Sequence, residues 1–451
     1  MGKRLAIVSS YNEECGAAFY SSRLKVHLEA AGHQVEVKRL PVSLLRVQTP
    51  RVIRNKGDQA VAQIASELRD YDAVLLQFEP GLYGSNRRTS YRRVTKLLKA
   101  SRNAIVTVHG FDRASSGAGI ISAIDALIDR DLRRAYAHIT VGGLVDEIGR
   151  FWKFVASARH VKVMTFCRSD ETLLKRFYGL ERITNYPITY FSREQAEAVR
   201  ASVDRDAFLA KVGLDPRHKH FAVYGFLNAY KGHMTAMKAL EYLPDDWHLS
   251  IIGGEHPQGL SPDRDIGPYV RQLLAFGLTQ NGPGAADQAV MAMPGEGQAM
   301  KPVSYEKQQI RTELFRYSEF RNFLPSRDLR DRIHFLGQVS DEEMPRFYHA
   351  MDYAVHPYIK TMSGQSGSGP ATMAVEFGSD ALFSNAPVFR EMGQYFPGAM
   401  NFFNIGNFVE LAEALQRFPN FRDELAGNRE KALQTYNPRG MVQTYMDLID
   451  A

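Results

Sequence analysis

Two glycine-rich segments in the second half of the chain carry residue types that bind phosphate. The first runs from Tyr224 to Gly232, between an apolar run and a helical stretch. Glycines such as Gly225 let the backbone approach a ligand closely, and Lys231 at the turn could neutralise a diphosphate. A flexible loop is the alternative interpretation of this segment.

The second segment is the Ser/Gly loop at residues 363–370, which opens a predicted helix over 371–377. Small residues at a helix N-terminus expose N–H donors, and the helix dipole favours an anion there. A flexible loop is again the alternative for this segment alone. Two such loops, each placed after a strand, are a more specific signal of a phosphate site than either loop by itself. Each loop could therefore bind an anion, the first through Lys231 and the second through the N–H groups of Gln365, Ser366, Gly367, Ser368 and Gly369.

The elements around these loops alternate between short apolar runs and helical stretches, which predicts parallel sheets covered on both faces. A helix is expected over 17–31, and one connecting helix with a linker over 192–219. The fold class is therefore α/β with two doubly wound domains, whose ligands bind beyond the carboxyl ends of the strands. The expected strands are residues 5–8, 34–37, 72–77, 103–108, 137–141, 161–164, 221–224, 248–252, 333–336 and 353–356.

These series place an N-terminal domain at residues 1–195, a C-terminal domain at 196–438 and a final helix at 439–451 that crosses back to the first domain. Nearly eighty residues separate Gly254 from the strand at Ile333, where a short connection would suffice. Loops of that length are usually functional or disordered. We expect an insertion over about 258–325 without a catalytic role. A lid, an acceptor-contacting arm and an oligomer contact are the alternatives.

The composition is that of a soluble globular protein, with 44% hydrophobic and 24% charged residues among 451. No apolar run approaches the roughly 18–20 residues that span a bilayer, and we do not expect the N-terminal sequence to act as a signal peptide. Two cysteines, Cys15 and Cys167, are too few for a disulfide framework, so a cytoplasmic location is expected. The histidines show no metal-ligand spacing, so no metal is expected.

The charge is unevenly distributed along the chain. Residues 1–200 carry 32 Lys and Arg against 20 Asp and Glu, whereas residues 201–451 carry 24 against 30. A predicted helix over 87–102 places Arg88, Arg92, Lys96 and Lys99 near one face. This face could contact anionic lipid at the inner membrane face or a lipid-diphosphate acceptor; an ordinary surface helix is the alternative. Nucleic acid is not expected, because the aromatic residues do not interleave with the basic ones.

Several segments resemble glycosyltransferase family 4. Its donor domain is similar to residues 225–232, 251–254, 335–343, 363–370, 377–385 and 389–391, and its acceptor domain is similar to residues 14–20, 77–84 and 106–110. The resemblance implies a GT-B fold, with two Rossmann-like domains facing a cleft. It also implies hexosyl transfer from a nucleoside diphosphate-sugar to an acceptor hydroxyl, with retention and without an essential metal. The acceptor would be a glycan, a glycolipid or a lipid-linked intermediate in polysaccharide biosynthesis.

The resemblance also implies roles for individual residues. His109, Lys231 and Gln365 are the expected catalytic residues, and Glu79 and Gly110 lie on the acceptor side. The expected donor-binding residues are Gly16, Ala17, Gly225, Phe226, Lys231, Gly253, Gly254, Gly337, Val339 and Gln365, Ser366, Gly367, Ser368 and Gly369.

Two departures from the family pattern bear on catalysis. Gln365 and Met373 stand where many members carry a Glu pair, and Phe226 replaces a frequent Arg. A catalytically silent GT-B partner of another transferase is therefore a second hypothesis. A GT-B nucleotide-sugar epimerase is a third, but it needs acids for proton abstraction that the sequence does not place.

Overall fold

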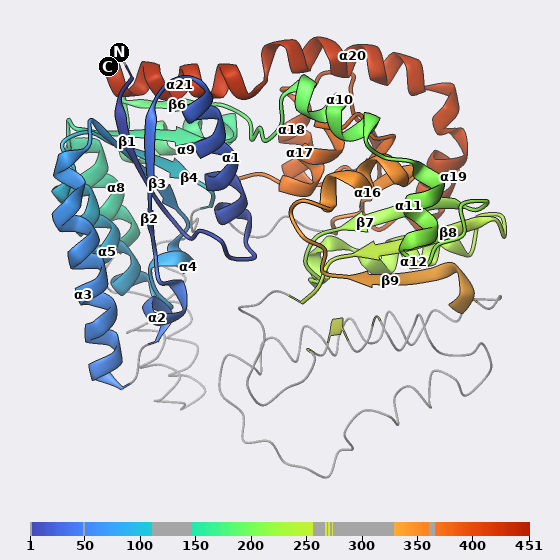
Figure 1. Ribbon diagram of the computed structural model, residues 1–451, viewed down its shortest axis with the longest axis horizontal. Coiled ribbons are helices and arrows are strands. Elements are labelled where there is room, and N and C mark those ends of the chain that lie inside the picture. The colour runs from blue at the N-terminus through green and yellow to red at the C-terminus, as the bar shows by residue number, and fades with distance from the viewer. Residues whose placement is uncertain are drawn as a thin grey trace, which may run out of the picture. The chain divides into compact units, whose positions relative to one another are not determined.

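The computed structural model describes residues 2–47, 50–110, 147–255, 267, 269–270, 273, 329–359 and 366–451 (Figure 1). The chain forms two compact units. The first comprises Met1–Tyr190, Met362–Gly369 and Thr435–Ala451, and the second comprises Phe191–Thr361 and Pro370–Gln434. Nearly all of the expected insertion, the expected strand at 137–141 and Gln365 lie outside the described residues.

The first unit is built on a six-stranded sheet in the order β2-β1-β3-β4-β5-β6, and every pairing is parallel. Its central strands are buried apolar runs, as expected for a sheet covered on both faces. The strands are β1 (Arg4–Ser9), β2 (Gln34–Arg39), β3 (Ala73–Phe78), β4 (Ala104–Val108), β5 (Val161–Thr165) and β6 (Ile183–Asn185).

Helices α3, α5 and α8 pack side by side on one face of this sheet, against Val8, Val74 and Val106 (Figure 1). Helices α1 and α21 pack together on the opposite face, where Tyr445 of α21 bonds to Thr107 of β4 at 2.7 Å. The helices of this unit are α1 (Gly16–Ala30), α2 (Val42–Arg46), α3 (Arg51–Glu67), η1 (Leu68–Asp70), α4 (Pro80–Tyr83), α5 (Arg87–Ala100), α8 (Glu147–Ser157), α9 (Arg168–Tyr178) and α21 (Pro438–Asp450).

The second unit is built on another parallel sheet, in the order β12-β11-β10-β7-β8-β9. Numbered within the unit, this is the 3-2-1-4-5-6 order of dinucleotide-binding folds read from the other edge. The strands are β7 (Lys219–Tyr224), β8 (Trp247–Ile252), β9 (Ile333–Gly337), β10 (Tyr353–His356), β11 (Ala381–Ser384) and β12 (Asn401–Phe403).

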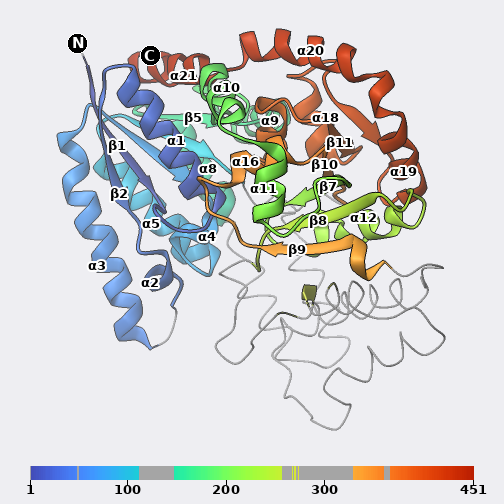
Figure 2. The same ribbon diagram turned by 45° about the vertical axis from the view of Figure 1, so that its right-hand side comes forward.

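Helices α12 and α19 pack on one face of the second sheet, and α10, α11 and α16 lie side by side on the other (Figure 2). The helices are α10 (Arg193–Ala201), α11 (Arg205–Lys211), η2 (Ala229–Lys231), α12 (His233–Leu240), η4 (Arg330–Arg332), α16 (Met344–Ala350), α17 (Gly369–Glu376), α18 (Pro387–Gly393), α19 (Phe408–Arg417), η5 (Phe418–Asn420) and α20 (Arg422–Thr435).

These sheets confirm the expectation of two doubly wound α/β domains. The prediction of a single connecting helix over 192–219 was wrong. The segment forms two helices, α10 and α11, each with its own N-cap. Ser192 and Gln195 form a capping box, and the Asp204 side chain accepts a hydrogen bond from the Ala207 N–H at 3.1 Å. Two caps twelve residues apart therefore start two short helices.

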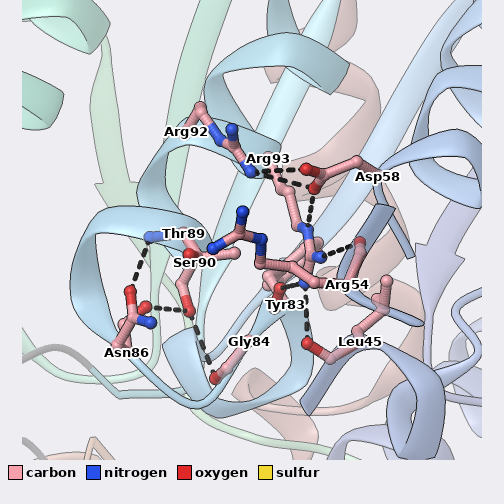
Figure 3. Close-up of polar contacts among 10 residues, drawn as sticks. All are labelled: Leu45, Arg54, Asp58, Tyr83, Gly84, Asn86, Thr89, Ser90, Arg92 and Arg93. Atoms are coloured by element: carbon pink, nitrogen blue, oxygen red, sulfur yellow. Dashed lines mark hydrogen bonds and ion pairs between the residues drawn. The ribbon is translucent and has the colours of Figure 1, made fainter. Parts of the chain in front are cut away.

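Arg93 of α5 joins four helices of the first unit (Figure 3). Its side chain is only 2% exposed, and its Nη1 donates to the carbonyls of Leu45 at 2.7 Å and Tyr83 at 2.8 Å. Its Nη2 donates to the Arg54 carbonyl at 3.4 Å, and its Nε donates to Asp58 Oδ1 at 2.7 Å. One guanidinium thus ties α5 to α2, α3 and α4, which follow the carboxyl ends of β2 and β3.

The adjacent Arg92 provides a matched comparison, because it also pairs with Asp58 but is exposed. Arg93→Met should lower the free energy of unfolding by about 2 kcal/mol, because two buried carbonyls lose their donor. Arg92→Met should cost about 0–1 kcal/mol, as for other surface ion pairs. Urea unfolding of the two variants measures the difference, and equal losses would contradict a central role for Arg93.

Candidate functional site

The strand order of the second sheet reverses between β7 and β10, which are neighbours in space but not in sequence. In open parallel sheets, ligands bind outside the carboxyl ends of the strands at such a switch point. Gly225 follows β7 directly, and Pro357 and Tyr358 follow β10. The first candidate site is therefore the group of loops that carries these residues.

Lys231 lies in this group, in the short helix η2 between β7 and α12. Its side chain is 5% exposed, and its Nζ donates a hydrogen bond to the Tyr358 hydroxyl. The Nζ lies 4.5 Å from the centre of the Tyr358 ring and 5.4 Å from that of Tyr230. Burial lowers the pKa of Lys231. In the part of the chain that the structure describes, no carboxylate pairs with this ammonium.

Three glycines let the loops around Lys231 pack closely. Gly225, Gly232 and Gly253 have φ values of +99°, +72° and +148°. A Cβ at Gly225 would lie 3.1 Å from the Lys231 Nζ, and one at Gly253 would lie 2.2 Å from the Gly225 carbonyl oxygen. A Cβ at Gly232 would lie 1.8 Å from the Pro357 carbonyl oxygen. Backbone conformation therefore favours glycine at all three positions, and neighbouring backbone atoms exclude a side chain at Gly232 and Gly253.

The structure brings other expected donor-binding residues to the ends of β7, β8 and β9. Gly253 donates to the Gly337 carbonyl at 2.8 Å, and Gly254 donates to Gln338 Oε1 at 3.0 Å. Phe226 and Val339 are partly buried in the segments that follow β7 and β9. Sequence reasoning missed Gln338, which lies between the expected residues Gly337 and Val339, and Tyr358, which is 127 residues from its partner Lys231.

The Ser/Gly loop groups with the first compact unit rather than with Lys231. Ser366 and Ser368 are buried, and α17 begins at Gly369. A Cβ at Gly367 would lie 2.5 Å from Ile188, and one at Gly369 would lie 2.7 Å from the Tyr190 hydroxyl. Neighbouring side chains thus account for both glycines.

Helix α17 lacks a carboxylate free to bind a ribose. Met373 is buried, and Glu376, the only acid in its sequence, accepts a hydrogen bond from the Phe191 N–H at 3.3 Å.

In the first sheet the strand order reverses at β1 and β3, and their carboxyl ends carry a second group of expected residues. Gly16 begins α1, while the Ala17 side chain is buried in the core. Only the backbone of these two residues could therefore meet a ligand. Glu79 follows β3; desolvation raises its pKa, and Arg46 partly offsets this effect.

His109 follows β4 and precedes Gly110. Its Nε2 lies 2.8 Å from Gln77 Oε1, and its ring makes edge contacts with Tyr20 and Phe166, at centroid distances of 5.2 and 5.0 Å. Burial lowers the pKa of His109 to about 3, so the ring is neutral at physiological pH. A neutral imidazole can orient a hydroxyl but carries no charge to bind phosphate.

The expected basic helix is present as α5, with Arg88, Arg92, Lys96 and Lys99 exposed. Arg92 is partly neutralised by Asp58, 2.7 Å away. Within the described residues, no three His, Cys, Asp or Glu side chains are arranged to hold a metal ion. No helix in the described ranges is both long and apolar enough to span a bilayer.

No family model and no curated protein sequence matches the chain. Solved structures do match it over 99% of both chains. Anabaena HepE in complex with UDP-glucose is 13% identical with a TM-score of 0.56, and sucrose-phosphate synthase from Thermosynechococcus elongatus is 16% identical with a TM-score of 0.58. WaaG, a glycosyltransferase involved in lipopolysaccharide biosynthesis, is 14% identical with a TM-score of 0.54. At these identities the likeness shows the fold, which is the GT-B fold of glycosyltransferases.

Buried neutral histidines should make the protein less stable in mild acid. Burial, with a smaller contribution from Lys231, lowers the pKa of His356 to about 3, whereas an unfolded histidine titrates near ~6.5. As the pH falls from ~6.5 toward 3, the unfolded chain takes up a proton that the folded chain excludes, so the free energy of unfolding decreases.

The variant His356→Phe tests this effect, because both ring nitrogens of His356 are buried without a partner among the described residues. Below pH 6, the unfolding free energy of the variant should fall less steeply with decreasing pH than that of the wild type, by about 1.4 kcal/mol per pH unit. Urea unfolding at pH 7.5, 6.0 and 5.0 measures this slope. A variant slope equal to that of the wild type would contradict the assignment.

Proposed function

We propose that the protein is a glycosyltransferase that moves a sugar from a nucleoside diphosphate-sugar to an acceptor hydroxyl with retention. The fold is that of glycosyltransferases, and the similar HepE structures contain UDP, UDP with glucose, or UDP-glucose. A hexosyl donor is proposed on the same grounds. The chemistry of the donor site needs no metal, because a protein cation can take the diphosphate charge.

The observation that carries the proposal is the buried ammonium of Lys231 without a carboxylate partner among the described residues. Burying an unpaired charge is costly, so such a group is usually compensated by a counter-ion. Tyr358 offers a hydroxyl and an aromatic face, which stabilise a cation without cancelling its charge. A diphosphate at the switch point would supply the missing negative charge.

The proposed division of roles follows from the chemistry of each group. Lys231 stabilises the negative charge that grows on the departing diphosphate, together with N–H groups from Gln365 to Gly369. Backbone groups of Gly16 and Ala17 meet the diphosphate from the first unit. His109 and Gln365 orient the sugar, and Glu79 and Gly110 belong to the acceptor side.

A second candidate is a catalytically silent GT-B protein that binds a nucleotide-sugar for a partner transferase. The composition of α17 favours it, because Met373 cannot accept hydrogen bonds from a ribose and Glu376 is engaged by the Phe191 N–H. In the transferase, the ribose contact would come from another element.

The acceptor is proposed to be a glycan, a glycolipid or a lipid-linked intermediate, bound by a cytoplasmic protein at the inner membrane face. Support comes from α5, on which Arg88, Lys96 and Lys99 are exposed and make no ion pair with a described carboxylate. Arg92 contributes less positive charge because of Asp58.

The variant Lys231→Ala separates the transferase from the silent protein. In an enzyme it should lower kcat about a hundredfold or more while weakening nucleotide affinity less, because the charge matters most in the transition state. Lys231→Arg should rescue only part of the loss, since a planar guanidinium does not reproduce the contact of a compact ammonium group. Lys219→Ala is the matched control, because Lys219 lies at the amino end of β7 and is exposed.

Turnover and UDP affinity are measured on the same preparations. Wild-type protein that binds a nucleoside diphosphate-sugar but neither transfers nor hydrolyses it, over a broad panel of acceptors, would overturn the transferase and favour the silent protein.

Membrane contact through α5 should depend on charge. Sedimentation with vesicles containing anionic lipid should occur at low salt and weaken as salt rises. Replacing Arg88, Lys96 and Lys99 with Glu should abolish it, whereas Lys211→Glu with Lys431→Glu, both exposed positions of the second unit, should reduce it little. Equal sedimentation with neutral vesicles would contradict the proposal.

A further inference from the structure

Gln77 is a buried amide inside the otherwise apolar strand β3 of the first unit. Its Oε1 lies 2.8 Å from the Nε2 of His109. Its amide nitrogen makes no hydrogen bond with a described residue, and the nearby Tyr445 hydroxyl bonds instead to Thr107 at 2.7 Å and Tyr20 at 3.1 Å. A polar side chain in this position has to be explained by the groups that it contacts.

The contact with Gln77 determines which ring nitrogen of His109 carries the proton. An amide oxygen only accepts hydrogen bonds, so the facing Nε2 must donate. Because the ring is neutral at physiological pH, the other nitrogen, Nδ1, is then an unprotonated acceptor. The Gln77 amide nitrogen is buried and makes no hydrogen bond with a described residue, whereas the amide oxygen faces His109.

The ring of His109 is also fixed in space. Tyr20 and Phe166 contact it edge-on, with interplanar angles of 81° and 78°. The residue is only partly buried, and its Nδ1 makes no hydrogen bond within the described residues. One hydrogen-bond acceptor of defined direction is thus presented beyond the carboxyl end of β4.

We propose that Gln77 is a positioning residue that holds His109 as its Nε2–H tautomer, so that Nδ1 selects a donor sugar that offers a hydroxyl over one that offers a carboxylate. This inference rests on the proposed function. A hydroxyl can donate to the Nδ1 lone pair, whereas an ionised carboxylate has no proton to donate and is repelled by it. The site therefore favours a neutral hexose over a uronic acid.

The first test reads the tautomer directly. Nitrogen-15 NMR of the wild-type protein labelled at histidine, with His109→Gln used for assignment, should show Nε2 protonated and Nδ1 unprotonated from pH 5 to 8. An Nδ1–H tautomer, or titration of His109 in this range, would overturn the proposal. This measurement needs no turnover and no ligand.

The second test changes the tautomer by an isosteric substitution. The carboxylate of Gln77→Glu should favour the imidazolium, which places a proton on Nδ1. The wild type should bind UDP-glucose about tenfold more tightly than UDP-glucuronate, a ratio expected from one hydrogen bond. In Gln77→Glu this ratio should fall toward one or reverse. Gln77→Met should also lose the preference, but without titration of His109 in the NMR experiment.

Calorimetric titration supplies the two dissociation constants, and UDP alone is the reference for binding to the diphosphate site. Unchanged discrimination in Gln77→Glu, despite a protonated Nδ1, would overturn the selection role. If UDP binds but no sugar is ever transferred, the transferase function fails, while the binding ratio and the tautomer still decide the role of Gln77.

Discussion

The buried positive charge of Lys231 is the constraint on which the proposed donor site of this protein depends. An ammonium removed from water needs either an anion or a strongly polar surrounding, and here it has a tyrosine hydroxyl and two aromatic rings. The neighbouring His233 and His356 are kept neutral, because burial and then the field of Lys231 lower their pKa values to about 3. The described residues around Lys231 thus leave its charge unpaired, and the glycines at 225, 232 and 253 bring the loops close around it.

The topology of the sheets explains why the charge lies where a ligand can use it. Lys231 is joined to Tyr358 only because β7 and β10 are adjacent in a sheet whose order reverses between them. The first unit has the same arrangement, since Gly16 and Glu79 follow β1 and β3, the two strands between which its strand order reverses. His109 adds a neutral acceptor one strand further along, with Gln77 behind it. Lys231 at the second sheet therefore supplies a positive charge, whereas His109 at the first sheet supplies a hydrogen-bond acceptor of defined direction.

The sequence was sufficient for much of the fold. Uniform apolar runs such as residues 5–8 mark strands buried on both faces, and the glycine loop that carries Lys231 could be recognised from its place after a predicted strand. The strand β12 is three residues long and has no pattern to detect. The contact between Lys231 and Tyr358 spans 127 residues and depends on strand order, which no local signal encodes. Gln77 falls in the strand expected over 72–77 and in the segment 77–84 that resembles the acceptor domain, but its contact with His109 depends on the pairing of β3 with β4.

The most direct test of the central claim is the pKa of Lys231 itself, measured by NMR of carbon-13-labelled lysine with Lys231→Arg for assignment. The free protein should show a pKa below the ordinary ~10.4, because burial disfavours the ammonium. Saturation with UDP should raise this pKa, because a diphosphate within a few ångströms favours the charged form. A pKa of ordinary value that does not respond to saturating UDP would contradict the account.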